Sequence, residues 1–315
     1  MDTPILEFDK VSKSYRTHLS VRRGWILRDL SFSLKRGEIF GYIGPNGAGK
    51  TTSIRLTLGI LFPDAGSIRL FGEPAGRVRL KEKIGFLPEN PYFYDYLTAE
   101  EFLDFFGRLL GMSGADRRRR IPELLDLVGL GNRADRQLRK FSKGMVQRIG
   151  LAQALLNEPE LVILDEPMSG LDPMGRRQVR DIILDLKKQG KTVFFSSHIL
   201  QDAEMICDRV GILDRGRLLS IGPLAEFLSQ RVEFWEAWVS DCQVNLEDFQ
   251  AELVSAKNGD RLVRLHDEKR LEEFLREVQK RGGRLHSLQP QKATLEEVFV
   301  KEVRQGRDPS TRKSS

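Results

Sequence analysis

The sequence has few cysteines and no long apolar run. Its two cysteines, Cys207 and Cys242, are too few for a disulfide framework and favour a reducing compartment over a secreted protein. No stretch reaches the roughly 18 uninterrupted apolar residues of a membrane-spanning helix. The first residues, MDTPILEFDK, carry acids where a secretory leader needs a basic and then an apolar run. We therefore expect neither a leader nor a membrane span.

Further absences exclude several kinds of site and chain. The four histidines show no metal-ligand spacing and neither cysteine belongs to a C-x-x-C pair, so no protein-held zinc is expected. No Ser-His-Asp or Cys-His arrangement is suggested either. Hydrophobic residues make up 40% and charged residues 30% of the 315 residues, which is typical of a soluble globular protein with about two domains and excludes disorder or a fibre.

The positive charge is concentrated in one segment. The formal net charge is +6, and residues 108–148 hold 11 basic against 4 acidic residues, which accounts for the whole excess. A solvated helical face and an anionic partner both explain such a patch, and both stay open. An excess confined to one segment is not a general nucleic-acid footprint.

Apolar patterning predicts the order of the elements. The expected strands of the first region are residues 5–15, 26–35, 38–44, 67–72, 161–167, 192–197 and 210–214, and its helices are 53–62 and 174–190. A helical segment from about 98 to 157 opens with a capping box of Thr98 and Glu101. Alternating apolar strands and helices imply a mostly parallel sheet.

The composition changes near residues 225–231. Beyond them, expected strands at 232–240, 261–266 and 283–289 alternate with expected helices at 245–254, 268–283 and 294–303, which predicts a small α+β domain. We therefore expect a first domain at 1–225, an accessory domain at 231–304 and a disordered tail at 305–315.

A glycine-rich segment follows the strand expected at 38–44 and opens a helix. It fits G-x-x-x-x-G-K-[ST] at every position: Gly44, Pro45, Asn46, Gly47, Ala48, Gly49, Lys50 and Thr51. Such a loop turns backbone N–H groups towards phosphates, with Lys50 reaching the β- and γ-phosphates and the Thr51 hydroxyl on Mg²⁺. Thr52, also counted as a binding residue, stands where a dinucleotide fingerprint needs its third glycine.

Two acids end the apolar strand at 161–167. A buried strand delivers Asp165 and Glu166 to the edge of the sheet where ligands of α/β proteins bind. Asp165 is predicted to hold Mg²⁺ through water, and Glu166 to act as general base on the water that attacks the γ-phosphate. Acids at a strand end are common, so the pair alone is a weak signal. It indicates a catalytic site because the same chain contains a phosphate loop.

With these motifs in place, residues 141–148 (FSKGMVQR) resemble the signature of the ATP-binding cassette (ABC) family, the ATPases of ABC transporters. The resemblance spans about residues 4–225. Ser142 and Gly144 match the family's Leu-Ser-Gly-Gly-Gln, whereas Phe141, Lys143 and Met145 depart from it. It implies an α/β fold: a P-loop NTPase core with a mostly parallel sheet, an N-terminal antiparallel β subdomain, an inserted helical signature subdomain and a small C-terminal α+β domain.

The resemblance also implies roles for further residues. In the family, the residues matching Ser142 and Gly144 hold the γ-phosphate of the ATP bound by a second subunit, and the loop matching residues 169–172, which ends in Asp172, crosses to that subunit. His198 follows a strand as the family's switch histidine does and is expected to touch the γ-phosphate.

Two further binding roles are less well defined. At one position the residue differs from the family's, and for the other role two residues compete. Glu89 stands where the family has a glutamine that binds Mg²⁺, so it offers an oxygen together with an extra negative charge. Tyr15 resembles the aromatic that stacks on adenine. Trp25 competes for this role, and packing alone also explains both rings.

The function implied is that of the ATP-binding and ATP-hydrolysing subunit of an ABC transporter. Two subunits, either two copies or one copy and a related ATPase, would sandwich two Mg-ATP and drive separate transmembrane permease subunits from the cytoplasmic face of the membrane. Residues 90–103 are expected to bind a cytoplasmic helix of the permease. No nucleic-acid partner is expected. The alternatives are a soluble ABC ATPase acting on nucleic acid or the ribosome, and a binding module with an inactive site.

Residues 293–299 (ATLEEVF) are similar to the tails of bacterial export ATPases of the drug-resistance and sodium-extrusion types. This similarity favours export over import. A dimerising or regulatory role for the accessory domain stays open.

Overall fold

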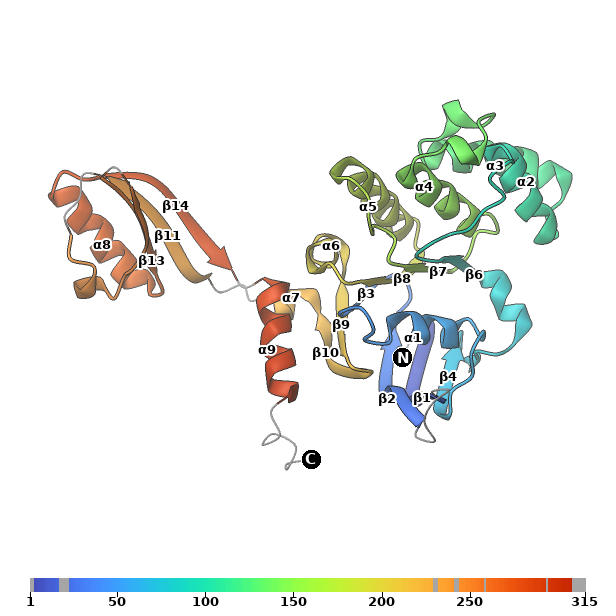
Figure 1. The fold of residues 1–315 in the computed structure, drawn as a ribbon, viewed down its shortest axis with the longest axis horizontal. Helices are drawn as coiled ribbons and strands as arrows, with labels where there is room; N and C mark the ends of the chain where they lie inside the picture. Colours follow the sequence, from blue (N-terminus) through green and yellow to red (C-terminus); the bar gives the residue numbers. More distant parts are fainter. Residues whose placement is uncertain are drawn as a thin grey trace. The chain divides into compact units, whose positions relative to one another are not determined.

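The chain divides into two compact units, Met1–Leu224 with Lys301–Ser315, and Ala225–Val300 (Figure 1). The computed structural model describes residues 3–16, 23–228, 232–240, 244–257, 259–292 and 294–307. The domain limits expected from composition stay a prediction. Residues 305–307, expected in the tail, belong to helix α9 (Leu295–Arg307), and residues 308–315 lie outside the described residues.

A six-stranded sheet forms the centre of the first unit, in the order β10-β9-β3-β8-β7-β6. Its strands are β3 (Ile39–Ile43), β6 (Ile84–Leu87), β7 (Leu161–Asp165), β8 (Thr192–Ser197), β9 (Arg209–Asp214) and β10 (Arg217–Pro223). Strands β9 to β6 pair in parallel, whereas β10 pairs antiparallel with β9. Every residue of β3, β7 and β8 is buried, as expected for strands covered on both faces.

An antiparallel sheet lies beside it, in the order β2-β1-β4-β5. Its strands are β1 (Leu6–Arg16), β2 (Arg23–Leu34), β4 (Ala65–Leu70) and β5 (Glu73–Pro74). The two sheets share one core, in which the Phe32 ring stacks on Phe8 with centroids 4.5 Å apart and on Phe40 at 5.8 Å. Helix α1 (Lys50–Thr57) ends earlier than the predicted 53–62, because the chain turns at Gly59, whose φ is +65°.

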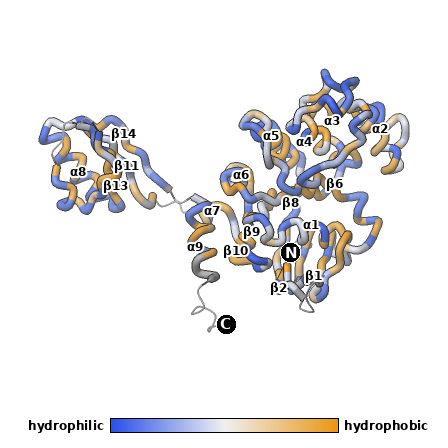
Figure 2. The backbone as a smooth tube through the Cα atoms, in the orientation of Figure 1, coloured by the Kyte–Doolittle hydropathy of each residue, from blue (hydrophilic) through white to orange (hydrophobic). Residues whose placement is uncertain are grey.

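The helices of the signature region are α2 (Ala99–Leu109), α3 (Gly114–Leu127) and α4 (Lys143–Ala154). The predicted capping box is confirmed: Thr98 Oγ1 accepts from the Glu101 N–H and the Glu101 carboxylate accepts from the Thr98 N–H. The arginine run of α3 is a hydrophilic stretch in Figure 2. Arg117 pairs with Asp104 at 2.6 Å, so part of the basic patch is neutralised within the helices.

Two further helices of the first unit follow β7 and β8. They are α5 (Pro173–Lys188) and α6 (Leu200–Ile206), whereas the single turn α7 (Leu224–Phe227) follows β10 at the boundary between the two units. The predicted fold class is confirmed by this parallel core with its antiparallel sheet and inserted helices. In the part of the chain that the structure describes, no helix is both long and apolar enough to span a membrane.

The accessory unit is a four-stranded antiparallel sheet with one helix packed on it. The strands run in the order β12-β13-β11-β14, with β11 (Val232–Ser240), β12 (Glu252–Lys257), β13 (Asp260–Leu265) and β14 (Arg284–Lys292). Helix α8 (Glu268–Lys280) places Phe274 against Val263 in a separate core.

One predicted element of this unit is wrong. The helix expected at 245–254 is a short 3₁₀ turn, η4 (Glu247–Phe249), followed by strand β12. Gln250 takes a left-handed φ of 49°, which ends the turn, and pairing with β13 then satisfies the backbone of β12. The sequence Asn258-Gly259 is a hairpin signal that favoured this outcome.

Asp64 fastens β1 to the segment that precedes β4. Its carboxylate accepts hydrogen bonds from the Ser14 N–H and hydroxyl, both at 2.7 Å, and pairs with Lys13 at 3.1 Å. The Ser14 hydroxyl, the Ser14 N–H and the Lys13 ammonium lower the pKa of Asp64 to about 2. This stabilisation is therefore present above the ordinary pKa near 3.8 and is lost as the pH falls towards 2.

We predict that Asp64→Asn destabilises the first unit by about 1 kcal/mol at pH 7, or a few degrees in melting temperature, because the bonds to a charged acceptor are lost. Melting curves of variant and wild type, recorded between pH 7 and pH 2, should converge at the acid end. Asp181→Asn, which removes an exposed pair with Arg177 at 3.9 Å, serves as the control with little effect. A constant difference at all pH values would contradict the ionic role.

Candidate active site

The predicted phosphate loop connects β3 to α1, and two of its glycines are required by geometry. Gly49 caps α1 with a φ of 112°, a conformation that favours glycine. A Cβ on Gly44 would lie 2.3 Å from the Leu213 carbonyl oxygen. The loop therefore depends on glycine where it leaves the strand and where it enters the helix.

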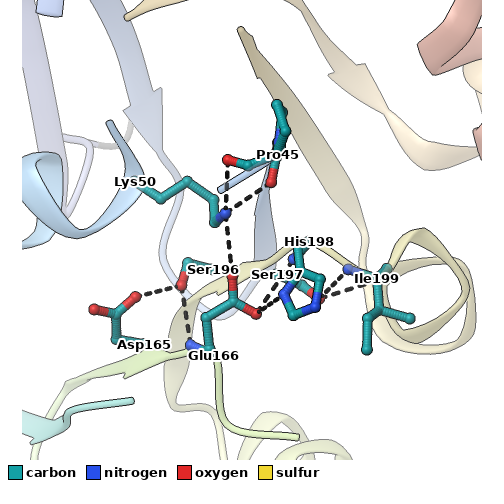
Figure 3. A network of polar contacts seen from close by, with 9 residues as sticks. Pro45, Lys50, Asp165, Glu166, Ser196, Ser197, His198 and Ile199 are labelled. Atoms are coloured by element: carbon teal, nitrogen blue, oxygen red, sulfur yellow. Dashed lines mark hydrogen bonds and ion pairs between the residues drawn. The ribbon is translucent and has the colours of Figure 1, made fainter. Parts of the chain in front are cut away.

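Lys50, the first residue of α1, has a side chain that is 5% exposed. Its ammonium donates to the carbonyl oxygens of Gly44 at 2.7 Å and Pro45 at 3.3 Å. It also lies 3.1 Å from Glu166 Oε1, as an ion pair (Figure 3). The loop thus folds around its own lysine, and a carboxylate at the end of β7 balances the charge.

Glu166 connects the phosphate loop to His198. Its Oε2 lies 2.7 Å from His198 Nδ1 and accepts a longer bond of 3.3 Å from the His198 N–H (Figure 3). Glu166 itself has a left-handed φ of 50°, so the chain turns sharply directly after β7. One buried carboxylate therefore contacts two groups that the sequence predicted to act on the same phosphate.

A pocket of about 470 Å³ opens beside the phosphate loop. The residues that line it are Tyr15, Ile26, Asn46, Gly47, Gly49, Lys50, Thr51, Thr52, Glu89 and Glu166. The structure thus brings Tyr15 and Glu89 to the predicted loop. Of the two aromatics proposed for adenine, Tyr15 lines the pocket and Trp25 is not among its lining residues.

The predicted residues Ser142, Gly144 and Asp172 lie outside this pocket and close to one another. Ser142 caps α4 and Asp172 caps α5, where its Oδ1 accepts from the Gly175 N–H at 2.7 Å. A Cβ on Gly144 would lie 3.9 Å from the Leu171 side chain, so the signature segment abuts the loop that carries Asp172. Their expected contact with ATP held by a second subunit stays a prediction.

The oxygen donors at the pocket suit Mg²⁺. Thr51 and Glu89 line it, and the buried Asp165 ends β7 beside Glu166. Among the described residues, no three His, Cys, Asp or Glu side chains are grouped to hold a metal ion. Mg²⁺ commonly binds through one or two carboxylates plus substrate phosphates, so this sparse set of hard oxygens fits it.

Sequence reasoning missed two polar residues near the site. Ser196 lies on β8 directly opposite Asp165. Asp202 on α6 is buried, and this burial raises the pKa of its carboxyl, with Arg176 and Arg180 of α5 acting in the opposite direction. Neither residue belongs to a local motif, and only the pairing of β7 with β8 and the packing of α5 near α6 reveal them.

Comparison with known proteins identifies the family. Residues 27–169 match the model of the family described as ABC transporter. An uncharacterised ABC transporter ATP-binding protein of Synechocystis is 54% identical over 71% of this chain and 64% of its own length, so the chain spans less than two thirds of that relative. The linearmycin resistance ATP-binding protein of Bacillus subtilis is 38% identical over 72% of this chain and 71% of its own.

The chain belongs to the ABC transporter ATP-binding proteins. A dimeric ATP-binding cassette solved in a post-hydrolysis state with ADP and phosphate has the same fold, with a TM-score of 0.63 and 25% identity over 70% of this chain and 98% of that one. This ABC protein is an ATPase, and those of its relatives whose names state a role are named for export or resistance, which does not favour the nucleic-acid alternative.

We predict that Lys50→Ala weakens ATP binding by about tenfold or more, because a charge-assisted contact to phosphate is lost. A fluorescent ATP analogue titrated into both proteins measures the change. Lys188→Ala, which removes an exposed lysine paired with Asp185, is the matched control and should bind as wild type does. An unchanged affinity of the Lys50 variant would refute the role of the phosphate loop.

Proposed function

We propose that this ABC ATPase binds Mg-ATP in the pocket of Lys50 and hydrolyses it with Glu166 as general base. The observation that carries the proposal is the buried contact of Glu166 with both Lys50 and His198, beside a pocket lined by the phosphate loop. Lys50 would hold the β- and γ-phosphates, and His198 would contact the γ-phosphate from the end of β8. A binding module with an inactive site would have no need for this set of charged groups.

The nucleotide's other contacts are assigned to residues that line the pocket and to their neighbours in the phosphate loop and at the end of β7. Tyr15 would stack on adenine, and the backbone from Gly44 to Thr52 would surround the phosphates. Mg²⁺ would be held by Thr51, Asp165 and Glu89, and when bound it neutralises charge on the phosphate oxygens. The protein's own part is to place Glu166 where it can accept a proton from the attacking water.

A second subunit, a copy of this chain or a related ATPase, would complete the site. Ser142 and Gly144 at the N-terminus of α4, together with Asp172 on the neighbouring loop, would face the γ-phosphate held by the other subunit. The dimeric state of the solved cassette supports this arrangement. Closure on two Mg-ATP and opening after hydrolysis would then supply the movement.

Exposed aromatic side chains mark a surface for the permease. Tyr92 is 98% exposed, Tyr96 is 60% exposed, and Tyr94 lies edge-on to Phe105 with ring centroids 5.4 Å apart. An apolar patch at the start of the helical subdomain suits a helix of a transmembrane subunit. We place the protein at the cytoplasmic face of the membrane, and the name of the linearmycin resistance relative favours export.

We predict that Glu166→Gln keeps ATP binding and slows hydrolysis by about a hundredfold or more, because the glutamine amide does not accept the proton. Phosphate release measures turnover, and gel filtration with ATP should show accumulation of a dimer. Glu160→Gln, which alters a carboxylate paired with Arg36 and Lys83 away from the pocket, should turn over normally. Normal turnover of the Glu166 variant would remove Glu166 as the base.

We also predict that the double variant Tyr92→Ser, Tyr96→Ser reduces recovery of the membrane-spanning protein that co-purifies with the tagged wild-type chain from detergent-solubilised membranes. The apolar area available to the permease is smaller, whereas ATP hydrolysis by the isolated variant should be unchanged. Val78→Ser removes an apolar side chain elsewhere whose exposure, 77%, lies between those of the two tyrosines, and is the control. Full recovery by the double variant would exclude this surface.

A further inference from the structure

Ser196 is buried beside Asp165 and Glu166 at the end of β7. It is the next-to-last residue of β8, is paired with Asp165 in the parallel register and is 0% exposed. Its hydroxyl donates to Asp165 Oδ1 at 2.6 Å, and its oxygen accepts from the Glu166 N–H at 3.0 Å (Figure 3). A single side chain thus contacts both acids that the proposed function uses.

The directions of these two hydrogen bonds are fixed by chemistry. A backbone N–H can only donate, so Ser196 Oγ must accept from Glu166. An ionised carboxylate can only accept, so the single hydroxyl proton must point to Asp165. Both hydrogen bonds therefore hold the Ser196 hydroxyl in one orientation. The bond that it donates restrains the position of Asp165 Oδ1.

The bond to the Glu166 N–H fixes a turn that the sheet does not. Glu166 has left the β ladder, which ends with the pair Asp165 and Ser196, and its φ of 50° is unfavourable for a residue with a Cβ. The Ser196 oxygen satisfies the N–H of this turned residue. This turn directs the Glu166 side chain towards Lys50 and His198.

The neighbouring residue, Ser197, makes different hydrogen bonds. Ser197 Oγ accepts from the Ile199 N–H at 2.9 Å and donates to the Ile199 carbonyl oxygen at 3.1 Å, so it shapes the loop after β8. Alternation of side chains along the strand sends the two serines to opposite faces. The chain therefore contains its own control for loss of a buried hydroxyl at this position.

We propose that Ser196 is a positioning residue, which orients Asp165 towards the metal ion and sets the backbone turn that places Glu166. This inference rests on the proposed function, in which Asp165 holds Mg²⁺. Carboxylate ligands of metal sites are commonly oriented by hydrogen bonds from residues around them. We infer that the Ser196 hydroxyl does this for Asp165.

Mn²⁺ binding to the ATP complex tests the inference without reference to turnover. In a Glu166→Gln background, which keeps ATP intact, Mn²⁺ is titrated and the free ion is measured by electron paramagnetic resonance. Ser196→Ala should raise the Mn²⁺ dissociation constant about tenfold, whereas ATP binding measured in EDTA should change less than about twofold. Ser196→Thr, which keeps the hydroxyl, should recover most of the Mn²⁺ affinity.

Two further variants separate the possible failures. Ser197→Ala should leave the Mn²⁺ affinity as it is in the background, and Asp165→Asn should reduce it. If Ser196→Ala binds Mn²⁺ normally while Asp165→Asn does not, the inference is overturned and the proposed function stands. If Asp165→Asn also binds Mn²⁺ normally, the metal role of Asp165 in the proposed function fails.

A merely structural role gives a different result. It would lower the melting temperature of Ser196→Ala without changing Mn²⁺ affinity, and that result overturns the inference. Should Ser196→Ala fail to fold, Ser196→Cys provides the measurement, because the thiol is a weaker donor and acceptor in the same place. Its Mn²⁺ affinity should then lie below that of Ser196→Thr, and equal affinities would count against the proposal.

Discussion

The parallel register of β3, β8 and β7 is the constraint on which the site depends. It aligns Ile43 with Ser197, and Ser196 with Asp165, so the three strands end at the same level of the sheet. The phosphate loop, the histidine and the two carboxylates leave the sheet from these three strand ends. Ligands of open α/β sheets bind at this edge because side chains and helix N-termini from separate segments converge there.

The groups that sequence reasoning found are those defined by local patterns. The phosphate loop is a contiguous run with glycines at required positions, and Asp165 with Glu166 directly follows an apolar strand. His198 was placed by its distance from a strand end. Each of these signals needs only a few neighbouring residues, which is why the fold class and most of the lining of the pocket could be predicted.

What could not be predicted depends on pairing between distant segments. Ser196 touches Asp165 only because β8 lies beside β7, and the sequence offers no sign of which serine of the strand faces Asp165. The choice between Tyr15 and Trp25 likewise required the position of the pocket. The wrong helix at 245–254 has the opposite cause: its apolar spacing suited a helix, but pairing with β13 outweighed that local preference.

The Lys50 to Glu166 ion pair has a consequence for the order of events. The same ammonium cannot hold both this carboxylate and a γ-phosphate at full strength, so in the proposed function nucleotide binding at Lys50 would be an exchange of one anion for another. The arriving phosphate would displace Glu166 from the lysine and leave its carboxylate available to a water molecule. The carboxylate oxygen that pairs with Lys50 would therefore become free only when the substrate is in place, so that the ion pair would couple nucleotide binding to the release of the proposed base.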